Sequence, residues 1–248
     1  MIVVRESAPS TNSDPLVLAA DAPHGLTVAA VSQTAGRGQR GNSWESAPGL
    51  NLCFSTVLRP RHIDARRQFV LSMAVAMAVA RCVGRELGSE ADVSVKWPND
   101  IYVGDRKIAG ILIENTLTGM NIDKAVVGVG LNVNQLEFVS DAPNPVSLAM
   151  LSGRSHDTGA LLGELASAIV SACDDADSDD AESRAALCRR YNSMLWRSDG
   201  ELHRWMELPS RRVVDAAIVT VADDGMLSLR HRDGSLHSYA FKEIGALL

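Results

Sequence analysis

The feature that most restricts the fold of this chain is a long run of small and aliphatic residues between positions 65 and 87. Its alanines and methionines predict one long helix that packs tightly against a sheet. The most apolar part, residues 69–83, is interrupted by Ser72 and Arg81 and is shorter than the roughly 20 apolar residues that cross a bilayer. We therefore expect a buried helix in a globular core, and no membrane span.

Other segments have strand or helix patterns. Residues 50–57 alternate apolar and polar side chains, which predicts a strand with one buried face. A hairpin is expected around Gly104 and Asp105. The remaining strand patterns lie at residues 2–4, 26–32, 93–96, 101–103, 107–115 and 124–133. Shorter helix patterns lie at residues 15–20, 158–174 and 181–195.

The composition changes near Ser198. From there to the end, short strand patterns alternate with turns at Asp224-Gly225 and Asp233-Gly234. We expect two domains, residues 1–197 and residues 198–248, of which the second is a small all-β domain such as an SH3-like barrel.

Charge and cysteine usage narrow the class of protein. The formal net charge of −6 argues against general nucleic-acid binding, which needs a basic surface. The four cysteines are far apart without metal or redox spacing, and the six histidines form no metal-binding pair. No secretory signal is recognisable at the start of the chain, so we expect reduced thiols and a cytoplasmic location.

Three segments carry candidate chemistry. The first is the loop Gly-Arg-Gly-Gln-Arg-Gly-Asn-Ser-Trp at residues 36–44. Its glycines let backbone N–H groups converge on an anion, and Arg37 and Arg40 add positive charge. The loop matches neither a Walker A motif nor a dinucleotide-binding fingerprint. The alternative is a flexible basic loop without a ligand.

The second segment is Lys-Trp-Pro-Asn-Asp at residues 96–100. Pro98 prevents a regular helix, so Lys96 and Asp100 are held by a fixed corner. Asp100 could accept a proton from an incoming amine, and Asn99 could bind an amide, a base edge or a metal-bound water. The alternative is a structural ion pair between Lys96 and Asp100.

The third segment contains Lys107 and Gly110, followed by two strand glycines at Gly128 and Gly130. A lysine directed into a pocket supplies one compact positive charge for a phosphate or a carboxylate. Glycines weaken a strand unless something packs closely on it, and a flat ligand ring would account for both. A surface lysine in a hairpin is the alternative.

Together these motifs resemble biotin protein ligase, the family that adenylates biotin and attaches it to a carrier lysine. The resemblance runs from Ser10 to about Asn134, and the β-rich end fits the small C-terminal domain of that family. It implies an α+β fold, in which a mixed β-sheet related to class II aminoacyl-tRNA synthetases carries flanking helices.

The resemblance also implies site residues. Lys107, Asp100 and Arg37 are the expected catalytic residues, with Asp100 acting on the acceptor amine. No protein residue is assigned to a metal. The residues expected to bind biotin or its adenylate are Ser10, Thr11, Asn12, Gln33, Gly36, Gly38, Gln39, Arg40, Trp44, Lys96, Asn99, Gly110, Gly128, Gly130 and Asn132.

The implied reaction uses ATP, biotin and Mg²⁺, and its partner is a biotin carboxyl carrier domain of a carboxylase. A homodimer is a further expectation from the family. Two rival functions stay open: a lipoate or octanoate ligase of the same superfamily, and a biotin-binding sensor without catalysis.

The chain departs from the family pattern at two points. Gln39 stands where many members have arginine, at a position that helps to retain the reactive adenylate. Arg40 is the candidate substitute, and an Arg40→Ala variant that released more adenylate would support this. The other departure is that no helix-turn-helix pattern precedes the catalytic motifs, so neither repressor activity nor nucleic-acid binding is expected.

Overall fold

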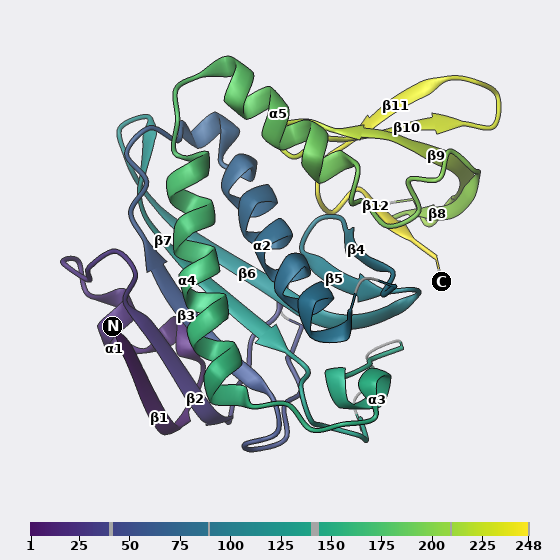
Figure 1. Ribbon diagram of the computed structural model, residues 1–248. Helices are drawn as coiled ribbons and strands as arrows, with labels where there is room; N and C mark the ends of the chain where they lie inside the picture. Colours follow the sequence, from purple (N-terminus) through teal and green to yellow (C-terminus); the bar gives the residue numbers. More distant parts are fainter. Residues whose placement is uncertain (40–41, 89, 140–143, 209, 248) are drawn as a thin grey trace.

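A computed structural model describes residues 1–39, 42–88, 90–139, 144–208 and 210–247. Helices and strands are interspersed along the chain (Figure 1). The helical segments are η1 (Thr11–Ser13), α1 (Pro15–Leu18), η3 (Ala65–Arg67), α2 (Phe69–Leu87), α3 (Leu148–Ser152), α4 (Thr158–Ala176) and α5 (Ala181–Asn192). The strands of the larger sheet are β1 (Ile2–Ala8), β2 (Thr27–Gln33), β3 (Leu52–Leu58), β4 (Val93–Lys96), β5 (Asp100–Val103), β6 (Arg106–Thr118) and β7 (Asn121–Leu131).

Within these described residues, the larger sheet has seven strands in the order β1-β2-β3-β7-β6-β5-β4. Of the strand pairs that the structure describes in this sheet, β1 and β2 are parallel and the others antiparallel, so the sheet is mixed. Helices α2 and α4 run side by side over one face of it (Figure 1). The expected α+β fold, with a mixed sheet and flanking helices, is confirmed.

Helix α2 forms the centre of the core. From Val70 to Val83 nearly every side chain is buried, which is why the run of alanine, valine and methionine belongs to a helix covered by neighbours. Small side chains let α4 and the sheet approach it closely. The helix ends at Gly88, whose φ of +92° suits glycine. No helix in the described parts of the chain is long and apolar enough to span a membrane.

Strand β3 differs from its prediction, because all seven of its side chains are buried. Phe54 and Leu58 face the helical core. Val57, on the other face, packs with Val17 and Val28 in a second apolar cluster. The expected solvent-exposed face does not exist because the segment around η1 and α1 covers it.

That covering segment is fastened to the sheet by a buried lysine. Lys124 of β7 donates hydrogen bonds to the carbonyl oxygens of Leu18 and Ala19, both at 2.9 Å, where α1 ends. At the other end of α1, Asp14 accepts from the Leu16 N–H and pairs with Arg5. These contacts hold residues 10–12 over the middle of the sheet.

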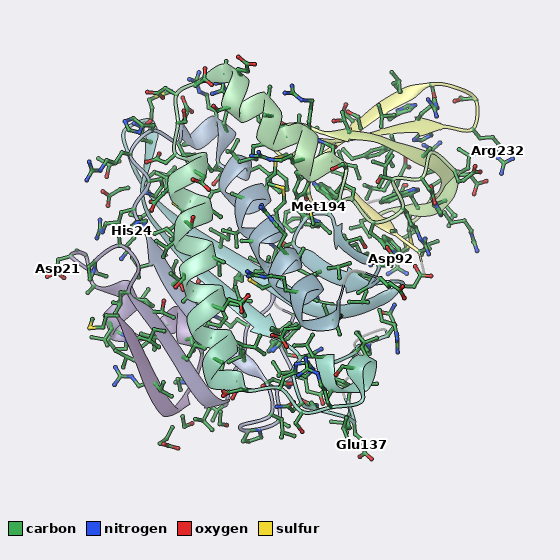
Figure 2. All side chains as sticks on the ribbon, viewed as in Figure 1. Asp21, His24, Asp92, Glu137, Met194 and Arg232 are labelled. Atoms are coloured by element: carbon green, nitrogen blue, oxygen red, sulfur yellow. The ribbon has the colours of Figure 1, made fainter. Side chains whose placement is uncertain are left out.

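The C-terminal region is a second, antiparallel sheet, with strand order β11-β10-β9-β8-β12 among the described residues. Its turns include Asp224-Gly225 and Asp233-Gly234, as predicted. Figure 2 shows Arg232 projecting from its outer end. The strands are β8 (His203–Glu207), β9 (Val213–Val221), β10 (Leu227–His231), β11 (Leu236–Tyr239) and β12 (Ile244–Ala246).

Candidate active site

The face of the larger sheet that lies away from α2 and α4 carries a row of small residues. Strand register places Asp100, Gly110, Gly130 and Cys53 side by side on four neighbouring strands. The next row on the same face contains Leu112, Gly128 and Ser55. The three glycines leave the centre of this face without side chains, so other groups can approach the backbone closely.

Protein side chains make that approach here. A Cβ added at Gly130 would lie 2.3 Å from Trp44 Cε2, and one added at Gly128 would lie 2.1 Å from Asn12 Oδ1. A flat ligand ring on both glycines stays an expectation. In this structure the indole of Trp44 rests on Gly130 and Gly110, and the Asn12 amide rests on Gly128.

The described part of the loop at residues 36–44 folds back on itself. The backbone N–H of Trp44 donates to Gly36 O at 3.0 Å, and the backbone N–H of Gly38 donates to Asn42 O at 2.7 Å. The two ends of the loop are therefore tied together, and Trp44 is directed inward over the sheet. Arg40, expected in the site, lies outside the described residues.

Loop and sheet enclose a cavity of about 130 Å³. It is smaller than the roughly 300 Å³ at which ligand pockets begin, because Trp44 lies on its floor. Fourteen of the predicted site residues line it: Ser10, Thr11, Asn12, Gln33, Arg37, Gly38, Gln39, Trp44, Asn99, Asp100, Lys107, Gly110, Gly128 and Gly130. Three other predicted residues, Gly36, Lys96 and Asn132, are not among the described residues that line it.

An ion pair joins two of the expected catalytic residues. Lys107 Nζ lies 2.7 Å from Asp100 Oδ1, and both side chains are mostly buried. The ammonium also lies 5.7 Å from the centre of the Trp44 ring. Asp100 is therefore paired with Lys107, whereas the sequence suggested Lys96 as its alternative structural partner.

Lys96 has a different environment. Its ammonium donates to Tyr102 Oη at 2.9 Å and lies over the rings of Tyr102 and Trp196. Burial is the main cause that lowers the pKa of Lys96. Asn132 similarly donates to Val146 O at 3.0 Å, so it supports the backbone beyond β7.

Two polar residues that hydrogen-bond to the cavity lining from behind it, Ser55 and Glu114, were missed by sequence reasoning. Ser55 Oγ lies 2.6 Å from Asn12 Oδ1, and Glu114 accepts from Asn12 Nδ2 at 2.7 Å and from Arg37 at 2.9 Å. Strand alternation could have indicated both residues, because side chains at every second position lie on the same face of a sheet. Glu114 lies on the same face as Gly110, and Ser55 lies on the same face as Cys53.

A second hollow of about 320 Å³ adjoins the cavity and shares Gln39, Asn99 and Ile111 with it. Its other walls come from the start of α2 and from the C-terminal sheet, including Phe69 and Phe241. Gln39 Oε1 is buried at the junction and has no hydrogen-bond partner within the described parts of the chain. The two spaces together could hold a molecule with two distinct ends.

Among the described residues of the site, Lys107 pairs with Asp100 and Arg37 pairs with Glu114. Burial raises the pKa of the Cys53 thiol, which leaves it neutral in the floor rather than nucleophilic. Among the described residues, no group of three or more His, Cys, Asp or Glu is arranged to hold a metal ion.

Comparison with solved structures defines the class of fold. The chain superposes on the biotin protein ligase of Aquifex aeolicus, solved with biotin and ATP, with a TM-score of 0.77 over 98% of this chain and 97% of that one. Sequence identity is 21%, so this likeness concerns the fold. The architecture is therefore that of the biotin protein ligase catalytic fold with its C-terminal sheet.

Sequence comparison gives the family. Residues 4–132 match the model of the biotin/lipoate A/B protein ligase family. The biotin–[acetyl-CoA-carboxylase] ligase of Paracoccus denitrificans is 34% identical over 165 residues, which cover 65% of this chain and 68% of that protein. The bifunctional ligase/repressor BirA of Bacillus spizizenii is 33% identical over 147 residues, 57% of this chain but only 44% of the relative. The chain belongs to the biotin/lipoate A/B protein ligase family.

Proposed function

We propose that the protein is an ATP-dependent ligase that adenylates biotin and transfers the biotinyl group to a lysine of a carrier domain. One observation carries this proposal: the loop at residues 36–44, the corner at residues 96–100 and the strand that begins with Lys107 meet around one cavity. Family membership supports the same reaction class. The name of the Paracoccus relative points to a carboxylase as the source of the carrier.

In the first half-reaction, a carboxylate oxygen of biotin attacks the α-phosphorus of ATP, and the bond to the leaving pyrophosphate breaks. Lys107 stabilises the negative charge that develops on the phosphoryl oxygens, and Arg37 and the loop N–H groups add to this. The hollow beside the cavity offers room for the nucleotide, with Gln39 Oε1 as an acceptor at the junction.

Mg²⁺ is expected to arrive with the nucleotide and to be held mostly by phosphate oxygens, as is usual for this ion. Asn99 and Asp100 line the cavity and could add oxygen ligands. The ion would neutralise charge on the departing pyrophosphate.

In the second half-reaction, the amine of the carrier lysine attacks the acyl carbon, and AMP leaves. Asp100 would accept a proton from that amine once Lys107 is bound to phosphate instead. The Trp44 loop would exclude water from the mixed anhydride and slow its hydrolysis. The four cysteines are free thiols, which suits the reducing cytoplasm as the working location.

The proposal is tested by incubating the purified protein with a biotin carboxyl carrier domain, ATP and either biotin or lipoate. Mass spectrometry should show one biotinyl addition on the carrier, and pyrophosphate should be released with biotin but not with lipoate. Pyrophosphate release with lipoate instead of biotin would assign the protein to the lipoate branch of the family. Biotin binding without pyrophosphate release would identify a sensor.

A further inference from the structure

Three polar side chains outside the candidate active site form a short line of hydrogen bonds. Glu86 lies in the last turn of α2, Ser152 is the last residue of α3, and His156 lies between α3 and α4. The end of α2 is next to α3 in Figure 1. Ser152 Oγ lies 2.8 Å from His156 Nε2, and His156 Nδ1 lies 2.7 Å from Glu86 Oε2. The three residues line neither the cavity nor the adjoining hollow, so this group is separate from the site described above.

The fold holds the imidazole of His156 in one orientation. Its side chain has no exposed surface. Its backbone is bound on both sides by Asn134, whose Oδ1 accepts from the His156 N–H and whose Nδ2 donates to His156 O, both at 2.9 Å. The two ring nitrogens therefore face fixed partners, a carboxylate on one side and a hydroxyl on the other.

The carboxylate determines which ring nitrogen carries the hydrogen. An ionised carboxylate only accepts hydrogen bonds, so Nδ1 donates to Glu86. In a neutral imidazole, Nε2 then has no hydrogen and accepts from the Ser152 hydroxyl. An alternative acceptor for that hydroxyl, Arg154 O, is farther away at 3.4 Å. The serine thus donates its hydrogen to a base that is oriented by an acid.

The surroundings of the three groups suit nucleophilic chemistry. Ser152 is an exposed residue, whereas the ring of its base is shielded from water. Arg154 places positive charge nearby, because its backbone N–H donates to Ser152 Oγ at 3.4 Å and its guanidinium lies 3.4 Å from Glu86. Serine hydrolases use the same order of groups on the same ring nitrogens: the imidazole takes the serine proton, and the carboxylate stabilises the imidazolium.

We infer that Ser152 is an activated nucleophile, with His156 as its general base and Glu86 as a positioning residue, and that this site hydrolyses small activated esters. Ser152 Oγ attacks the acyl carbon, and His156 Nε2 takes its proton and gives it to the departing alcohol oxygen. Water then attacks the acyl-serine and gives a proton to His156, which returns it to Ser152 Oγ as the carboxylic acid leaves. This activity is independent of the proposed function.

The first experiment is covalent labelling of the full chain with diisopropyl fluorophosphate at pH 8, where histidine side chains are ordinarily neutral. Ser152 Oγ displaces fluoride, so peptide mass spectrometry should find the diisopropylphosphoryl group on this serine. The variants are Ser152→Ala, His156→Gln and Glu86→Gln. Ser155→Ala is the matched control, because Ser155 is a nearby exposed serine that takes no part in these contacts.

Hydrolysis of p-nitrophenyl acetate gives the second measurement. The wild type and Ser155→Ala should be labelled and should release p-nitrophenol at the same rates, whereas Ser152→Ala should lose both reactions. His156→Gln should slow both by roughly 10²- to 10⁴-fold, the usual contribution of a general base. Glu86→Gln keeps an acceptor for Nδ1 but loses the charge, so kcat should fall roughly tenfold or more while KM stays within about twofold.

Absence of a label on Ser152 would overturn the inference, and so would equal rates in the wild type and Glu86→Gln. Thermal melting shows which variants fold. If His156→Gln, whose ring site is buried, does not fold, Ser152→Ala and Glu86→Gln decide the question. Biotin-dependent pyrophosphate release should be unchanged in Ser152→Ala, so the esterase and the proposed function stand or fall separately.

Discussion

Asp100 and Lys107 hold one another in place where the cavity meets the edge of the sheet. Each side chain is only partly exposed, at 21% and 27%, so the pair is screened less than a surface ion pair. Neither group is free to move until a competing charge arrives. A nucleotide phosphate would supply that competition for Lys107.

Replacing Lys107 by alanine should therefore separate binding from chemistry. We expect pyrophosphate release to fall by about 10²- to 10³-fold, the usual cost of removing one preorganised charge from a transition state. Biotin affinity should change little. Arg106→Ala removes an exposed cation next to Lys107 on β6 and should leave the rate unchanged. Wild-type rates in Lys107→Ala would remove it from the mechanism.

Gly130 is predicted to be intolerant of any side chain. Alanine there would place a Cβ 2.3 Å from the Trp44 ring, and the indole would have to leave the floor. We expect Gly130→Ala to weaken biotin binding at least tenfold in a calorimetric titration. Gly163→Ala on α4 is the control, because nothing lies within 4 Å of its added Cβ, and it should stabilise the helix by about 1 kcal/mol. Equal biotin affinity in both variants would contradict this role.

At the scale of helices and strands, the sequence predicted the elements whose structure depends mainly on residues near one another in the chain. The hairpin of β5 and β6 turns where Gly104 and Asp105 indicate, and the run of small apolar residues forms α2. The prediction of one exposed face for β3 was wrong, because residues distant in sequence cover that face. The short helix α3 had no pattern long enough to detect, since its five residues depend on the Ser147 cap and on burial of Leu148.

In the candidate site, too, sequence motifs were predictable but contacts between distant residues were not. Motif residues such as Asp100 and Lys107 could be named from sequence, but their pairing depends on strand register. Ser55 and Glu114 belong to no dense motif, and only the assembled sheet places them beside Asn12. The roles of all these residues in catalysis and binding stay predictions.

The hairpin of β8 and β9 contains a pH-sensitive ion pair. Hydrogen bonds from Arg212 lower the pKa of Glu207 from 4.5 to about 2. A lowered folded-state pKa stabilises the protein above pH 4.5, and this contribution is lost as the pH falls toward 2. Glu207→Gln should therefore cost about 1 kcal/mol at pH 7, an amount reduced by the 63% exposure of Arg212.

Melting curves between pH 7 and pH 2.5 provide the measurement. The difference between the wild type and Glu207→Gln should shrink as the pH falls below 4.5. Glu201→Gln replaces an exposed carboxylate just before β8 and should show no such convergence. A constant difference at every pH would contradict the role of this pair.

At the scale of the whole molecule, the two sheets share one hydrophobic core. Buried residues of the C-terminal sheet, among them Trp205 and Leu229, belong to the same cluster as α2. Trp97 crosses between the two regions, since its indole donates to Gly225 O at 3.1 Å and its ring meets Phe241 edge-on. The division at residue 198 stays an expectation, and the shared core leads us to expect that the two regions fold cooperatively.

The two regions should accordingly unfold together. Far-ultraviolet and near-ultraviolet circular dichroism should give one coincident urea transition. Trp97→Phe should lower the free energy of unfolding by about 1–2 kcal/mol, because Gly225 O loses a buried donor, while the transition stays single. Two separated transitions in the wild type would show that the C-terminal sheet is a separate folding unit.

The resting position of Trp44 has an optical consequence. The indoles of Trp97 and Trp205 donate to backbone carbonyls and that of Trp196 donates to Asp105, whereas the indole Nε1–H of Trp44 is buried with no hydrogen-bond partner in the described parts of the chain. If the Trp44 indole leaves the glycines on which it rests, the polarity of its surroundings and its neighbouring side chains change together. The surroundings of the other three tryptophans stay the same. The fluorescence of Trp44 should therefore report ligand entry in real time, so that stopped-flow emission, lost in Trp44→Phe, could follow the arrival of vitamin and nucleotide separately without an added dye.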